Sequence, residues 1–186
     1  MKKTLLISGG LILVVILLIV ILGIYKFNFT NDDIYIKNGD KTASKDATYL
    51  IEGQSVTLKN GSAESESAPN SASKNITRYF GNEVSGDLNG DGQIDKAFLL
   101  TQDGGGSGTF YYLAVALATN NGYEGLNTIL LGDRIAPQTT EFKDGQIIVN
   151  YAERKADEAM TVAPSIGVSR FFRVADNQLV EINQQK

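Results

Sequence analysis

Side chains that carry oxygen alternate along one short stretch of the chain, residues 87–95. The stretch fits the pattern D-x-[DN]-x-D-G-x-x-D at every defined position. Calcium prefers about six to eight hard oxygen ligands, and alternate residues of a tightly turned loop can direct their oxygens at one ion. A plain hairpin turn with solvated carboxylates is the alternative, but such a turn does not require oxygens at alternate positions. The pattern predicts a calcium site with these ligands: Asp87, Asn89, Asp91, the backbone carbonyl of Gln93, and Asp95.

The loop is not of the EF-hand type, because an EF-hand has a glutamate at its twelfth position and this chain has Phe98 there. A strand-like run begins directly after Asp95. In this respect residues 86–100 resemble the calcium loop of FG-GAP and integrin-type propeller blades. The resemblance implies a loop that joins two β-strands and binds calcium through the matched residues. It is confined to the loop, because no internal repeat that could form further blades is visible.

A second resemblance covers more of the chain. Several landmarks follow the order seen in LppP/LprE-type exported lipoproteins: Tyr79-Phe80-Gly81, the aspartate-rich loop, residues 109–117, Leu131-Gly132-Asp133 and residues 144–147. Those proteins are small components of the cell envelope. This chain lacks their cysteines, so the resemblance implies only an envelope location.

Composition excludes several classes of chemistry. The chain has no cysteine and no histidine, so it can form no disulfide, no thiolate or imidazole zinc site and no Ser-His-Asp relay. Its formal net charge is −4. A negative charge argues against nucleic acid as a partner and is compatible with cation binding.

The N-terminus predicts a membrane anchor over residues 1–25. The chain carries no charged residue from Leu5 to Tyr25, a length that spans roughly 30 Å of hydrocarbon as a helix. Lys2 and Lys3 precede this run, which predicts a single-pass protein of the cytoplasmic membrane with its N-terminus inside and its C-terminal domain outside. A cleaved signal peptide is the alternative, but its apolar region is shorter, about 7–15 residues, and ends at a small-residue site.

The rest of the chain predicts a mainly β protein. Residues 26–45 are polar and are expected to form a stalk, and residues 46–186 are expected to form one small antiparallel β-sandwich or curled-sheet domain. Residues 110–117 are apolar on both alternating faces, as in a central strand covered on both sides. Residues 60–75, rich in serine and asparagine, are expected to form a mobile loop. The segments with the clearest strand signals are 47–51, 54–58, 96–101, 109–118, 128–131, 146–151 and 168–174.

Two classes of function are compatible with these features. The first is a membrane-tethered, extracytoplasmic calcium-binding module that binds an envelope protein or glycan or has a structural role. The second is a carboxylate-based hydrolase of envelope glycans that uses Asp133 with Glu141 or Glu153. A glycosidase needs two carboxyl groups about 5–9.5 Å apart in a cleft, and the sequence contains no sign of one. We therefore favour the module.

Overall fold

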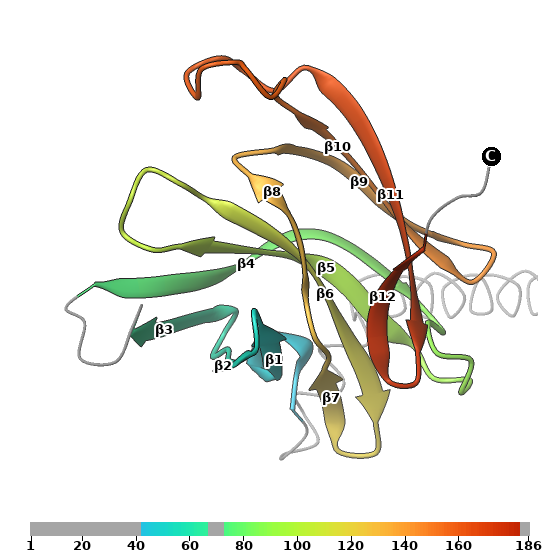
Figure 1. Ribbon diagram of the computed structural model, residues 1–186. Coiled ribbons are helices and arrows are strands. Elements are labelled where there is room, and N and C mark those ends of the chain that lie inside the picture. The colour runs from blue at the N-terminus through green and yellow to red at the C-terminus, as the bar shows by residue number, and fades with distance from the viewer. Residues whose placement is uncertain (1–41, 67–72, 183–186) are drawn as a thin grey trace, which may run out of the picture. The chain divides into compact units, whose positions relative to one another are not determined.

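The computed structural model describes residues 42–66 and 73–182, which belong to one compact unit that begins at Thr42 (Figure 1). The predicted anchor, residues 1–25, lies outside the described residues, as does the stalk up to residue 41. Within the described ranges, no helix is long and apolar enough to span a membrane. The end of the predicted stalk is part of the domain. Thr42 donates its backbone N–H to the Asn121 carbonyl at 2.9 Å and accepts from the Tyr123 N–H at 2.7 Å.

The described chain is mainly β with antiparallel strand pairs, as predicted (Figure 1). A six-stranded sheet has the order β3-β4-β5-β6-β7, with β8 also paired to β6; a four-stranded sheet has the order β12-β11-β10-β9; and β1 pairs with β2. A short 3-10 helix, η1 (Ser44–Asp46), precedes the strands. Their bounds are β1 Thr48–Ile51, β2 Gln54–Thr57, β3 Ser62–Glu66, β4 Lys74–Gly86, β5 Asp95–Asp103, β6 Phe110–Thr119, β7 Gly122–Gly125, β8 Ile129–Asp133, β9 Ala136–Lys143, β10 Gln146–Glu153, β11 Ile166–Ala175 and β12 Gln178–Ile182.

The central-strand prediction for residues 110–117 is confirmed by β6, which has strand partners along both edges and is buried on both faces. Its alternating side chains enter two separate cores. Leu113 and Val115 join one cluster, whereas Tyr112, Ala114 and Ala116 join the other. Burial of both faces explains why this segment is apolar throughout rather than at every second position.

The six-stranded sheet lies between the other two sheets (Figure 1). On one face Leu99 and Leu113 pack with Ile147, Val149 and Phe172 of the four-stranded sheet. On the opposite face, Phe98, Leu100 and Tyr112 pack with Tyr49 and other residues of the β1–β2 hairpin. Each fully buried large apolar side chain contributes roughly 1.5–3 kcal/mol. These two cores hold both ends of the β4–β5 loop, which contains the candidate site.

The mobile-loop prediction for residues 60–75 is wrong at both ends of that interval. Residues 62–66 form β3 and pair with β4, which begins at Lys74; residues 67–72 lie outside the described part. β3 is a polar edge strand in which Ser62, Glu64 and Glu66 are exposed. It forms because its backbone completes a ladder with β4, which does not require apolar side chains.

Candidate functional site

The candidate site is the loop that joins β4 to β5, residues 87–94. The loop closes where Gly86 and Asp95 pair across the two strands. Gly90 and Gly92 have φ values of +83° and +84°, a left-handed conformation that residues with a Cβ rarely adopt. The two glycines therefore allow the tight turn that the sequence pattern predicted.

Asp87 organises the first half of the loop. Its Oδ1 accepts the backbone N–H groups of Gly90 at 2.8 Å and Asp91 at 2.9 Å, and its Oδ2 accepts that of Gly92 at 2.9 Å. One carboxylate thus accepts hydrogen bonds from three amides, and the chain curls around it. Any ion bound by Asp87 would share its oxygens with these amides.

Asn89, Asp91 and Gln93 form one network in the second half of the loop. Asn89 donates from Nδ2 to Asp91 Oδ2 at 3.0 Å, and Gln93 donates from Nε2 to the same oxygen at 3.2 Å. The backbone N–H of Gln93 donates to Asp91 Oδ1 at 2.8 Å. The Asn89 amide, followed by the Gln93 backbone, lowers the pKa of Asp91. Asp91 is therefore ionised at neutral pH.

Asp95 has a structural role that the sequence did not indicate. It is fully buried. Its Oδ2 accepts the Leu88 N–H at 2.9 Å, and its Oδ1 accepts the Ala118 N–H at 2.8 Å. Burial raises its pKa, and the hydrogen bonds from Ala118 and Leu88 act in the opposite direction. The side chain thereby ties the candidate loop to the end of β6.

The donor set agrees in kind with calcium. Asp87, Asp91 and Asp95 supply carboxylate oxygens, and Asn89 and Gln93 supply an amide and a backbone carbonyl; calcium takes ligands of all three kinds. Within residues 42–66 and 73–182, no group of three Asp or Glu side chains lies close enough to hold an ion by carboxylates alone. Calcium at this loop would therefore depend on the amide and carbonyl oxygens as well. Each carboxylate has about four lone-pair sites, so hydrogen bonding to amides leaves acceptor capacity.

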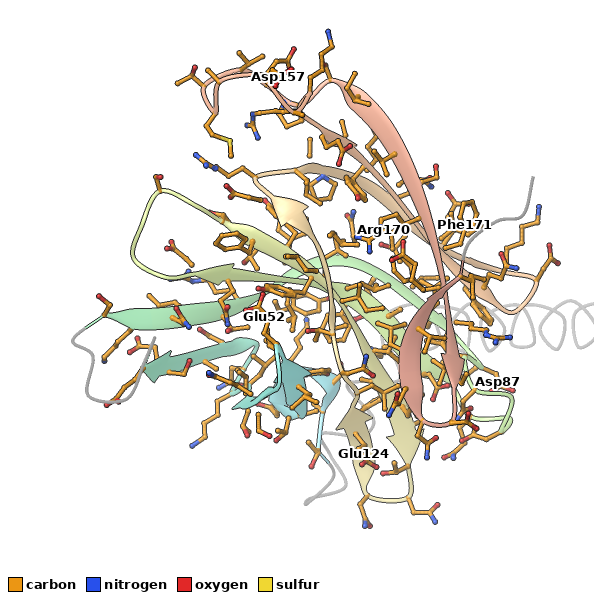
Figure 2. All side chains as sticks on the ribbon, viewed as in Figure 1. Glu52, Asp87, Glu124, Asp157, Arg170 and Phe171 are labelled. Carbon is orange, nitrogen blue, oxygen red and sulfur yellow. The ribbon has the colours of Figure 1, made fainter. Side chains whose placement is uncertain are left out.

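A cavity of about 570 Å³ lies beside the loop. Asn89, Asp91 and Gln93 form part of its lining, and the remainder comes from Leu50, from the β6–β7 hairpin with the residues after it, and from the β11–β12 turn. Figure 2 labels Asp87 on the loop and Glu124 on β7. No feature of the sequence pointed to this cavity, because its walls come from four separate segments.

Two of the three carboxylates of the hydrolase alternative are engaged elsewhere. Asp133 pairs with Arg134 at 2.8 Å, which lowers the pKa of Asp133. Glu141 accepts from the Thr139 hydroxyl at 2.9 Å. Neither Asp133, Glu141 nor Glu153 lines the cavity beside the loop or a second cavity, of about 720 Å³, bounded by η1, β1 and β7.

Comparison of the chain with family models, with curated proteins and with solved structures finds no match. The resemblance to the FG-GAP and integrin-type loop stays a prediction for residues 87–95, and that to the LppP/LprE-type proteins likewise stays a prediction.

Proposed function

We propose that this protein is a calcium-binding β-sandwich module, tethered by its N-terminal segment to the cytoplasmic membrane and located on the outer side. The calcium ligands are Asp87, Asn89, Asp91, the Gln93 carbonyl and Asp95. The ion stabilises the loop and, through Asp95, its attachment to β6. In this proposal the module binds a component of the envelope and carries out no chemistry of its own.

One observation carries the calcium proposal: the alternating oxygens belong to a single turned loop between two strands. Gly90, which has a positive φ, lies between Asn89 and Asp91, and Asn89 Nδ2 donates to Asp91 Oδ2 at 3.0 Å. Asp91 is exposed and ionised. Asp87, Asp91 and Asp95 lie within nine residues of the chain, and a divalent cation bound among them would reduce the repulsion between their charges.

The calcium experiment uses the full-length chain in a mild detergent. Calorimetry measures calcium binding, and tyrosine fluorescence follows thermal unfolding. An ion that binds only the folded state stabilises it by RT ln(1 + [L]/Kd), about 2.7 kcal/mol at a hundredfold excess over Kd. Extracellular modules bind calcium at roughly 10⁻⁴–10⁻³ M. We expect one calcium per chain and a weaker response to magnesium, which requires a smaller octahedral shell.

The variants Asp87→Asn and Asp91→Asn should lose the calcium response. Asp103→Asn is the matched control. Like Asp91, Asp103 accepts the backbone N–H of the residue two positions later, here Gly105 at 2.9 Å, but it lies outside the alternating pattern of residues 87–95. No heat of binding at about 10 mM calcium, together with a melt that is independent of calcium, would reject the site, since even weak extracellular sites are occupied there.

The membrane part of the proposal rests on the uncharged run from Leu5 to Tyr25 and on Lys2 and Lys3. A reporter fused after Lys186 should be active only outside the cytoplasm, and the chain should stay full length in the membrane fraction. A shortened, soluble product in the external fraction would contradict the uncleaved anchor.

A further inference from the structure

Neutral amides are the most frequent side chains in the lining of the cavity beside the candidate loop. Of its fourteen lining residues, four are asparagine and two are glutamine, and these come from the loop, the β6–β7 region and the β11–β12 turn. A side-chain amide presents a donor and an acceptor in one plane. That arrangement matches pairs of neighbouring hydroxyl groups, which also both donate and accept.

The charge of the lining excludes one class of ligand. Asp91 and Glu124 are its charged residues, and neither lysine nor arginine is among the fourteen. Two carboxylates repel phosphate, sulfate and carboxylate groups, and Glu124, which is not a proposed calcium ligand, does so even when an ion is bound at Asp91. They accept hydrogen bonds from hydroxyl groups instead.

The lining also has an apolar part, formed by Leu50, Leu117 and Leu126. Leu117 and Leu126 are nearly buried, and Leu50 is 43% exposed. Aliphatic side chains of this kind can cover the C–H groups of a ligand while its polar edge meets the amides. The volume of the cavity lies within the range of small-molecule sites, and its lining is more polar than is usual for them.

Two clamps hold the walls of the cavity in place. Asn127 donates from Nδ2 to the Leu179 carbonyl and accepts from the Leu179 N–H, both at 2.9 Å. This bond pair fixes the start of β12 against the segment after β7. Asp95 fixes the loop against Ala118 at 2.8 Å. Walls that are already ordered lower the entropic cost of binding.

From these observations we propose that the cavity binds a neutral, hydroxyl-rich ligand, namely an oligosaccharide. The amides of Asn120, Asn177 and Gln178 and the carboxylate of Glu124 bond the hydroxyl groups, and the exposed Leu50 covers the C–H face of a sugar ring. The dependence of this binding on calcium rests on the proposed function, because Asn89 and Asp91 belong both to the cavity wall and to the proposed ligand set. The lining of the cavity itself does not depend on the ion.

The test titrates the full-length chain, in detergent and in calcium, with maltotriose, cellotriose and chitotriose, each up to about 10 mM, tenfold above a Kd of about 1 mM. Capped, uncharged trialanine is the competing probe for a peptide ligand. The variants are the double change Glu124→Gln with Gln178→Ala, and separately Asn120→Ala. All three residues are exposed, so the variants should fold, and unchanged melting temperatures check this. Gln138→Ala, at an exposed position of β9, is the control.

We expect at least one trisaccharide to bind. Each lost hydrogen bond should weaken that binding by roughly threefold to tenfold, and Gln138→Ala should leave it unchanged. Binding of trialanine alone, an absence of binding by all three sugars, or sugar binding that ignores the cavity variants would overturn the inference. Sugar binding without any heat of calcium binding would uphold the cavity and reject the calcium module. Calcium binding without sugar binding would uphold the calcium module and reject the sugar site.

Discussion

Asp95→Asn separates the structural role of this residue from its proposed role as a calcium ligand. In calcium-free solution, the two oxygens of Asp95 accept the Leu88 N–H at 2.9 Å and the Ala118 N–H at 2.8 Å. Asparagine has only one acceptor oxygen, so one of the two backbone N–H groups would face the side-chain NH2 group, which donates and cannot accept. The perturbation is confined to the point where the loop joins β6.

The expected magnitude follows from these contacts. A hydrogen bond to a charged group contributes roughly 1.5–3 kcal/mol, and a buried donor left without a partner costs about 1–3 kcal/mol. Part of this loss is offset, because burial raises the pKa of Asp95 and asparagine has no charge to desolvate. We expect a net destabilisation of about 1–3 kcal/mol, or a melting temperature lower by roughly 3–10 °C.

The assay is thermal unfolding of the full-length chain in a calcium chelator, followed by tyrosine fluorescence. Asp91→Asn, at an exposed position of the same loop, and Asp103→Asn should each change the melting temperature by much less. Equal melting temperatures for Asp95→Asn and the parent chain in chelator would refute the reasoning and leave Asp95 with at most a role in ion binding.

Three further predictions concern the domain as a whole and use the same unfolding assay. Asn127→Ala should destabilise it by about 1–3 kcal/mol, because the Leu179 N–H and carbonyl both lose their partner; Asn120→Ala, an exposed change nearby, should have little effect. Gly125→Ala should destabilise it by about 1–3 kcal/mol through overpacking, since an added Cβ would lie 2.4 Å from the Thr48 carbonyl oxygen and 2.6 Å from the Tyr49 ring. Arg170, bonded to Glu181 at 2.7 and 2.6 Å, lowers the pKa of Glu181, so the pair's stabilisation is present above the unfolded pKa of Glu181 and is lost as pH falls through the lower folded value. Glu181→Gln should remove that pH-dependent contribution, less than about 1 kcal/mol for a partly exposed pair; an unchanged acid profile would contradict it.

The sequence by itself determined the features that depend on neighbouring residues. Glu52 and Gly53 marked the β1–β2 hairpin, and both have positive φ. The apolar runs of β5, β6 and β10 marked the strands that are most deeply buried, and that of β11 marked a strand with one buried residue, Phe172. The alternation in residues 87–95 marked the turned loop. Such signals are readable because side-chain direction in a strand or tight turn follows from local backbone geometry.

The polar strands form because they pair with neighbouring strands, and their own sequences do not mark them. The sequence did not indicate β3, β9 or β12, whose exposed residues are largely polar. The polar strand β4 has thirteen residues and two irregularities in its pairing with β5. A strand of this kind is stabilised by backbone hydrogen bonds to a neighbouring strand, which leave no apolar period in its own sequence.

Local sequence determined one part of the candidate site, and long-range packing determined the other. Asp87, Asn89 and Asp91 were found from their spacing, whereas the function of Asp95 depends on Ala118, 23 residues away. The cavity depends on contacts over still longer separations, such as that between Asn127 and Leu179, 52 residues apart. Only the packing of the two sheets brings those segments together, because the hydrophobic burial that drives it is non-directional and does not encode which polar side chains will meet at its edge.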